Sequence, residues 1–429
     1  MAQKAQLKYG ESEMSLALPD SLDWRLCMPK DAPAVGDLRA ALAASLEAPV
    51  ASPALRETAA GGKKITIVVC DETRPMRTRD FLPHLLDYLN SCGVADSSMD
   101  ILVAYGSHPR ISDEATRDLL GAEACSRVRV HHHDCRDEAG LVLLGETSQG
   151  VPVKVNRAVV ESDMVITAGG AMHHYFAGFG GGRKMIVPGC AGFDTILANH
   201  RLTLSPDEGA CLHPNCESGV LDGNPVHEAA LEAARMVGEV FTLNVVLNPE
   251  GKVAHFVSGE LDAAHRCACE LVDKIYAVDL PGRVGLVVAS CGGHPCDIDL
   301  IQMHKGVHHA ARALRDGGDL IICGKATNGT GSPTFAHWFD YPGLEAMAAA
   351  IREDYTLNAH TAYAMRRKSE RIRISLLSSL DVSFVHKMGI TPIESLQKTI
   401  DEAASSLGAG STALIIPQAN QTLQKLKQD

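Results

Sequence analysis

The sequence lacks three features that would each point to a particular class of protein. No uncharged apolar run is long enough to span a membrane. The opening segment, MAQKAQLKYGESEMSLALPD, mixes charged and apolar residues, so we expect no signal peptide. The 13 cysteines are scattered without any C-x-x-C spacing. Structural zinc and a disulfide framework are therefore not expected, and the reducing cytoplasm is the expected compartment.

Positive charge is also scarce. Lys and Arg number 40 against 52 Asp and Glu, which gives a net charge of −12 and disfavours a nucleic acid partner. The 429 residues, of which 45% are hydrophobic, are enough for two domains of unequal size. We expect a cofactor-binding domain in residues 1–279 and a substrate-closing domain in residues 280–429, whose last residues can pack back on the first domain.

Short apolar, β-branched runs end in polar or glycine-rich residues and alternate with amphipathic stretches, which is the pattern of an α/β protein. The expected strands are KITIVVC, MDILVAYG, VRVHHHD, DMVITAGG, GRVGLVVASCGG, DLIICG, IRISLLSS and ALIIPQ. The expected helices include TRDFLPHLLDYLNSCG, closed by Gly93, and PVHEAALEAARMVG, between Pro225 and Gly238. The run FTLNVVLNPEGKVAHFVSG predicts a β-hairpin that turns at residues 248–251.

The predicted fold is therefore α/β, with two domains of mixed or parallel sheets flanked by helices. Ligands of open α/β sheets bind at the carboxyl ends of the strands. We accordingly expect the active site in the cleft between the domains.

One strand is followed by HHYFAGFGGGRKMIVPG, residues 173–189. Its consecutive glycines, Gly180, Gly181 and Gly182, predict either a phosphate cradle made of backbone amides or a mobile surface loop. The dinucleotide motif needs glycine where Arg183 stands, and the P-loop pattern fails as well, so ordinary NAD or ATP binding is disfavoured. Lys184 precedes an apolar run that would bury its amine, lower its pKa and favour covalent cofactor attachment; a solvated surface lysine is the alternative.

Four histidines stand in or next to strand exits. His108 lies in GSHPR, directly after a strand, and His200 lies in a short helix after Gly192. His173 and His174 are adjacent, so on a strand they face opposite ways and one of them is expected to be structural. Converging imidazoles would supply acid–base or metal chemistry, whereas isolated ones are packing residues.

Two further sets of polar residues are candidates for binding an acid. Asp71, Thr73 and Arg74 stand together in CDETRP, where the planar arginine fork suits a carboxylate or phosphate and an internal Asp–Arg salt bridge is the alternative. A helix expected from about Asp297 places Gln302, Lys305 and His309 on one face. That face predicts either a polar stripe toward the cleft or a solvated surface.

Taken in order, DETRP, GSHP, HHYFAGFGGGRKMIVPG, NH, GVLDGNPVHEAA and QMHKG resemble the nickel-dependent lactate racemase family over most of the chain. The resemblance implies a nickel-pincer nucleotide, pyridinium-3-thioamide-5-thiocarboxylic acid mononucleotide, attached at Lys184, with His200 as the nickel ligand. It further implies that the glycines, Asp71 and Thr73 bind this cofactor. His108 and His174 would be the alternating acid and base, and Arg74, Gln302 and Lys305 would hold the substrate carboxylate.

The activity implied by the resemblance is that of a racemase or epimerase of a 2-hydroxy acid, acting by reversible hydride transfer between C2 and the cofactor. Two bases are needed because inversion must proceed from either face of C2. Ile301 stands where the family usually has tyrosine, and no tryptophan matches the family's pocket wall, since Trp338 lies too early. Tyr363 is a candidate replacement, and a 2-hydroxy acid larger than lactate is a candidate substrate.

The expected partners are the small-molecule 2-hydroxy acid and, transiently, cofactor-biosynthesis enzymes, without nucleic acid or membrane. Three other functions remain open from the sequence. A binding module for organic acids would use Arg74 and Lys305 but would have no need of a tethering lysine. A nickel or nucleotide carrier would need Lys184 and His200 but not His108 and His174. A nicotinamide-dependent 2-hydroxy-acid oxidoreductase would use the same histidines but lacks its nucleotide motif.

Overall fold

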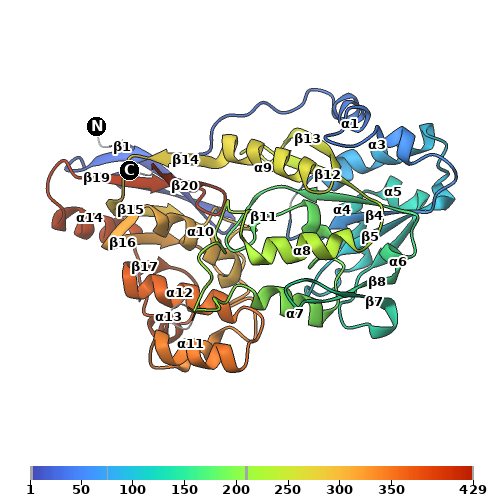
Figure 1. The fold of residues 1–429 in the computed structure, drawn as a ribbon. Coiled ribbons are helices and arrows are strands. Elements are labelled where there is room, and N and C mark those ends of the chain that lie inside the picture. Colours follow the sequence, from blue (N-terminus) through green and yellow to red (C-terminus); the bar gives the residue numbers. More distant parts are fainter. Residues whose placement is uncertain (1–2, 75, 208–210, 428–429) are drawn as a thin grey trace. The chain divides into compact units, whose positions relative to one another are not determined.

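The computed structural model describes residues 3–74, 76–207 and 211–427 (Figure 1). The chain divides into two compact units. We call the first the central unit, Asp31–Thr203 with Pro214–Ile275, and the second the terminal unit, Met1–Lys30 with Leu204–His213 and Tyr276–Asp429. The contacts thus group the first thirty residues with the C-terminal part of the chain, whereas the division expected from the sequence placed them in the first domain.

The central unit is built on a six-stranded sheet with the order β13-β12-β9-β4-β5-β6. Its strands are β4 (Ile65–Cys70), β5 (Met99–Ala104), β6 (Arg129–His132), β9 (Met164–Gly170), β12 (Val240–Leu247) and β13 (Val253–Glu260). All neighbours are parallel except β12 and β13, which form the predicted hairpin. Every residue of β4, β5 and β9 is buried, which explains why these strands are continuous apolar runs rather than alternating ones.

Helices and short strand pairs complete the central unit. The helices are α1 (Leu38–Glu47), α2 (Leu55–Thr58), α3 (Thr78–Ser91), α4 (Asp113–Leu120), α5 (Ala122–Arg127), α6 (Arg157–Val160), α7 (Phe193–Arg201), α8 (Pro225–Arg235) and α9 (Ala263–Tyr276), with 3-10 turns η1 (Asp96–Ser98), η2 (Glu138–Gly140) and η3 (Gly182–Met185). The antiparallel pairs are β7 (Leu141–Glu146) with β8 (Pro152–Asn156) and β10 (His173–His174) with β11 (Gly178–Phe179). Helix α8 begins as the sequence predicts. The Asn224 side chain caps its first turn, and Pro225 occupies the first helical position, where the missing amide hydrogen costs nothing.

The terminal unit contains a second six-stranded sheet, in the order β18-β17-β16-β15-β19-β3, with all neighbours parallel. Its strands are β3 (Asp23–Leu26), β15 (Val284–Ser290), β16 (Leu314–Cys323), β17 (Arg373–Leu377), β18 (Thr391–Pro392) and β19 (Thr412–Ile416). The other elements are the hairpin β1 (Gln3–Tyr9) with β2 (Ser12–Leu18), the parallel pair β14 (Ala277–Leu280) with β20 (Leu423–Leu426), α10 (Leu300–Arg312), η4 (Ala336–Asp340), α11 (Leu344–Glu353), α12 (Ala359–Arg371), α13 (Val382–Lys387) and α14 (Leu396–Ser406).

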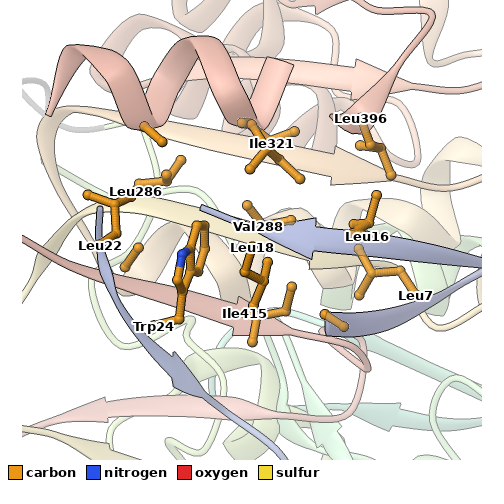
Figure 2. Packing of buried hydrophobic residues seen from close by; sticks show 14 of the residues in the cluster. Leu7, Leu16, Leu18, Leu22, Trp24, Leu286, Val288, Ile321, Leu396 and Ile415 are labelled. Carbon is orange, nitrogen blue, oxygen red and sulfur yellow. The ribbon is translucent and has the colours of Figure 1, made fainter. Parts of the chain in front are cut away.

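The N-terminal segment belongs to the terminal unit because it supplies part of that unit's core. Figure 2 shows Trp24 of β3 and leucines of the β1–β2 hairpin packed among side chains of the sheet and of α14. The labelled residues are Leu7, Leu16, Leu18, Leu22, Trp24, Leu286, Val288, Ile321, Leu396 and Ile415. Burying these large apolar side chains contributes about 1.5–3 kcal/mol each, which fixes the hairpin on the sheet.

Helix α10 begins three residues later than the sequence predicts. Asp299, not Asp297, caps the helix, because its carboxylate accepts a hydrogen bond from the amide of Gln302 at 2.8 Å. The Asp297 carboxylate is buried and accepts from the amides of Gly10 and Lys325 at 2.7 and 3.0 Å. Asp297 therefore ties the N-terminal hairpin to the loops of the sheet instead of starting the helix.

The predicted α/β class, with mixed and parallel sheets flanked by helices, is confirmed. Within the described residues, α3 and α9 are the longest helices at 14 residues each, and no helix there is long and apolar enough to cross a membrane. All thirteen cysteines are present as thiols.

Candidate active site

The candidate residues of the central unit lie in loops that follow three adjacent parallel strands. Asp71 directly follows β4, His108 lies in the loop after β5, and His173 and His174 follow β9. These loops are bonded to one another: the amide of Gly106 donates to the carbonyl of Gly189 at 2.9 Å. Because carboxyl ends of parallel strands meet at one edge of a sheet, residues far apart in the sequence are gathered there.

His108 is held by a buried carboxylate. Its Nδ1 donates to Oδ2 of Asp71 at 2.6 Å, and Thr73 donates to Oδ1 through both its amide and its hydroxyl. The His108 side chain remains 39% exposed, whereas that of Asp71 is 4% exposed. Burial alone would raise the pKa of Asp71, but the bonds from His108 and Thr73 and the charge of Arg74 lower it below its ordinary value. Asp71 thus orients one ring nitrogen of His108 and leaves the exposed ring for chemistry.

The alternative of an Asp–Arg salt bridge in CDETRP is not formed. The Arg74 guanidinium donates to the carbonyl and hydroxyl of Thr73 at 3.2 and 3.3 Å, and it makes no ion pair within 4.0 Å in the described part of the chain. Pro75, the last residue of the motif, lies outside the described residues. The half-buried Arg74 therefore keeps its cationic fork available for an anion beside Asp71 and His108.

Phe176 is the centre of a second cluster. Its buried ring lies edge-on to His174 at 4.5 Å and to His200 at 5.1 Å between ring centroids. The Nζ of Lys184 lies 5.3 Å from the Phe176 ring centroid and 3.2 Å from Nε2 of His174. Three of the predicted residues, supplied by β10, η3 and α7, are thus brought together around one aromatic ring.

The two adjacent histidines have different surroundings. Nε2 of His173 donates to Oδ1 of Asp273 on α9 at 2.7 Å, and its side chain is 1% exposed. His174, the next residue of β10, contacts Phe176 and Lys184 instead. His173 is therefore the structural member of the pair, because a strand turns neighbouring side chains to opposite faces.

The surroundings of His200 favour its neutral imidazole form. Burial lowers its pKa to about 3, and the positive charge of Lys184 adds to the effect. Neighbouring Asn199 holds α7 in place by donating from its side chain to the carbonyl of Val226 on α8 at 3.1 Å. A neutral imidazole on a fixed helix is the form in which histidine binds a metal.

The glycine loop is buried and closely packed. The amide of Gly180 donates to the carbonyl of Met172 at 2.8 Å, and that of Gly182 donates to Oδ1 of Asn244 at 3.1 Å. A Cβ on Gly182, whose φ is +50°, would lie 2.8 Å from the ring of His265. A phosphate held by these two amides would have to replace protein acceptors. The packing of the loop is itself a reason for the glycines, because a side chain at these positions would crowd the strand ends or α9.

In the terminal unit, the structure pairs Gln302 with Lys305 on α10. The Lys305 ammonium donates to Oε1 of Gln302 at 2.6 Å, and both residues are half-buried. His309, predicted on the same face, is buried instead, with its Nδ1 2.9 Å from the carbonyl of Ala419. The polar face of α10 is therefore limited to its first turns.

Comparisons with known proteins cover most of the chain. The family model described as the lactate racemase N-terminal domain matches residues 9–210, and the lactate racemase C-terminal domain matches residues 282–422. A lactate racemase from Lactiplantibacillus plantarum is 32% identical over 294 residues, covering 68% of this chain and 67% of the relative. The chain belongs to the lactate racemase family. It is therefore an isomerase of the racemase class.

The similarity to this family extends over the whole chain. A lactate racemase from Thermoanaerobacterium thermosaccharolyticum is 28% identical over 434 residues, covering 98% of this chain and 99% of the relative. The solved structure of the lactate racemase apoprotein from the same organism has a TM-score of 0.88 and covers 99% of this chain and 100% of its own. This racemase thus shares its fold with that apoprotein over nearly the whole chain.

Two features of this racemase were not predicted from the sequence. One is the position of Phe176 at the centre of its cluster, and the other is the hydrogen bond between Asp71 and His108. Phe176 sits between the histidine pair and the glycines, so its position in the motif was a usable signal, but an aromatic residue in a glycine-rich stretch is ordinarily read as packing. No local pattern connects Asp71 with His108, because they are 37 residues apart and on different strands.

Proposed function

We propose that this protein racemises a 2-hydroxy acid with a nickel-pincer nucleotide attached covalently to Lys184. The observation that carries the proposal is the cluster around Phe176, where an amine, a neutral imidazole and a second imidazole share one aromatic ring. When bound, the nucleotide would supply a hydride acceptor and donor for C2 of the substrate. His200 would be the one protein ligand of its nickel, and the nucleotide would supply the remaining donors.

The residues present fit such a group. No three His, Cys, Asp or Glu side chains of the described residues form a metal site by themselves, so a metal here depends on a ligand that brings its own donors. His200, whose pKa is lowered to about 3 by burial, offers the single neutral nitrogen. Lys184 is near enough to influence that pKa and is the attachment point. The aromatic wall of Phe176 suits a flat pyridinium ring.

The protonation of His174 supports a nucleophilic Lys184. The amide of Ala177 donates to Nδ1 of His174 at 3.3 Å, so a neutral ring carries its proton on Nε2. That nitrogen lies 3.2 Å from the Lys184 amine and can donate to it. Lys184 accepts this bond only after its ammonium, whose charge adds to the lowering of the His200 pKa, has lost a proton, and the neutral amine is the form that bonds covalently to a cofactor.

His108 and His174 are the two bases of the proposed reaction. Asp71 holds Nδ1–H of His108, which leaves Nε2 to take the proton of the substrate hydroxyl, as in other carboxylate–imidazole pairs. With Lys184 bonded to the nucleotide, Nε2 of His174 would face the hydroxyl of the opposite enantiomer, where it gives a proton in the Nε2–H tautomer and takes one in the Nδ1–H tautomer.

Each unit contains a cationic group of the kind that binds a carboxylate. In the central unit, Arg74 presents a guanidinium next to the Asp71–His108 pair. In the terminal unit, the Gln302–Lys305 pair presents an ammonium and an amide that both bind carboxylate oxygens. Lactate, the substrate named for the relatives, is the first acid to test, followed by larger 2-hydroxy acids because of Ile301.

The test is chiral chromatography of single enantiomers after incubation with protein co-expressed with cofactor-biosynthesis enzymes. We expect D and L acids to reach the same mixture without added nicotinamide, and substrate deuterated at C2 to keep its label in the product. Net formation of the 2-oxo acid, or a requirement for NAD, would replace the proposal with an oxidoreductase. A His108→Gln variant that retains its adduct is the matched inactive control.

A further inference from the structure

Arg183 is a buried cation without a carboxylate partner. It is 1% exposed and is among the largest fully buried side chains described. Its Nη2 donates to the carbonyl of Ala177 at 2.7 Å, and its Nη1 lies 3.0 Å from Nε2 of His265. No Asp or Glu oxygen of the described residues lies within 4.0 Å of the guanidinium, and its Nε has no protein partner there. A charge buried this way is unfavourable for stability, so another reason must account for its position.

The contacts of Arg183 close the glycine loop on itself. Ala177 precedes the glycines and Arg183 follows them, so the bond between them joins the two ends of the loop. Nε2 of His265 lies 2.8 Å from the carbonyl of Gly180 as well as near the guanidinium. His265 comes from α9 and is fully buried, and its ring covers Gly182. The fork therefore connects the start of the loop, at Ala177, with His265 of α9.

The same anchor sets the direction of the next residue. Arg183 and Lys184 are consecutive in the 3-10 turn η3, where successive side chains point about 120° apart. With Arg183 held inward, Lys184 is directed to a different side, where its Nζ meets His174 and the ring of Phe176. Rotation of the turn would move both side chains together.

We propose that Arg183 is a positioning residue for Lys184: its buried guanidinium fork holds the turn so that the lysine amine faces His174 and Phe176. The proposal rests on the proposed function, since it gives the lysine amine its direction for cofactor attachment. It requires the fork and not the charge alone. Ala177 and His265 lie in different directions from the guanidinium, and a lysine ammonium on a flexible stem does not reproduce the planar arrangement of two N–H groups.

The test measures the accessibility of the Lys184 amine in full-length protein prepared without cofactor-biosynthesis enzymes. Brief acetylation with acetic anhydride over a pH series, followed by peptide mass spectrometry, gives a labelling curve for Lys184. At the high-pH plateau, all amines are deprotonated, so the plateau rate reports orientation and screening rather than pKa. The variants are Arg183→Lys and Arg183→Met, with Arg127→Lys as the matched control, because Arg127 is a largely buried arginine of the central unit paired with Asp87 and Asp96.

We expect Arg183→Lys and Arg183→Met to raise the plateau rate of Lys184 several-fold and alike, and Arg127→Lys to leave the wild-type curve unchanged. If only Arg183→Lys keeps the wild-type labelling curve, the positive charge matters and the planar fork does not. If both variants keep it, Arg183 serves only as a packing residue. Either result overturns the proposal.

A second pair of variants leaves Arg183 in place and covers the case in which its replacements do not fold. His265→Gln places a carboxamide there, whose oxygen can accept from Arg183 and whose nitrogen can donate to the carbonyl of Gly180, so this variant should retain the wild-type labelling curve. His265→Leu should raise the plateau rate, and failure to do so contradicts the proposal. Because the labelling needs no nucleotide, its outcome is independent of the proposed function, whose failure shows instead as a missing adduct in co-expressed wild-type protein.

Discussion

His227 should make the stability of the central unit sensitive to mild acid. The ring lies on α8, is 1% exposed, stacks 6.4 Å from the ring of His265, and has no hydrogen-bond partner within the described chain. Burial, with the charge of Arg183 second, lowers its pKa to about 2. The unfolded chain binds a proton near pH 6.5 and the folded chain does not, so the stabilisation is fully present above that pH and is lost as the pH falls.

The size of the effect follows from the two pKa values. Between pH 6.5 and pH 5 only the unfolded form gains this proton, and each pH unit is worth about 1.4 kcal/mol, so His227 lowers the free energy of unfolding by about 2 kcal/mol at pH 5 relative to pH 8. Replacing His227 by Leu, a side chain of similar volume, removes this loss. His200 and His265, whose pKa values are each about 3, keep their own contributions, so the variant remains partly acid-sensitive.

The assay is urea denaturation at pH 8 and pH 5, followed by circular dichroism. Tryptophan fluorescence is unsuitable because Trp24 and Trp338 both belong to the terminal unit. We expect the pH 8 to pH 5 loss in His227→Leu to be about 2 kcal/mol smaller than in the wild type. Leu231→Ala on the same helix is the control, since it should lower the free energy of unfolding by the same amount at pH 8 and at pH 5. An equal pH loss in His227→Leu and the wild type would refute the reasoning.

Three further predictions concern the site. His108→Gln and His174→Gln should each reduce racemisation about 10²- to 10⁴-fold with the adduct mass unchanged, and activity retained by either variant would remove that base. Phe176→Leu should destabilise the protein by about 1 kcal/mol in thermal denaturation and leave only part of the chains carrying an adduct; full occupancy would contradict its role. Gly182→Ala places a Cβ against an imidazole of α9 at positive φ and should destabilise by about 1–3 kcal/mol. Gly238→Ala, which is also at positive φ but faces open space, should lower the free energy of unfolding by less, and equal losses in the two variants would be inconsistent with the clash.

The central sheet could be predicted from the sequence because its strands are short, buried on both faces and rich in β-branched residues. That pattern identified β4, β5 and β9, and the Asn248 turn identified the hairpin. The place of β3 could not be predicted in this way. It pairs with β19, nearly four hundred residues away, and no local pattern records which distant strand a short edge strand will join.

The candidate site was predictable only as a set of loops. Position and residue type made Lys184, the His173–His174 pair and His200 candidates, and the resemblance to the family selected His174 from the pair; the structure brings Lys184, His174 and His200 together. The geometry of these three residues depends on other side chains whose importance cannot be recognised from the sequence alone. Phe176 is an ordinary core aromatic by composition, and the anchoring of Arg183 requires His265 from a helix eighty residues later.

The most direct test of the account is the mass of the intact protein after co-expression with cofactor-biosynthesis enzymes, with peptide mapping of the added mass. The account predicts a single nucleotide adduct on the peptide that contains Lys184, absent in Lys184→Arg and present in His108→Gln. An actively racemising protein whose Lys184 carries no modification would contradict it.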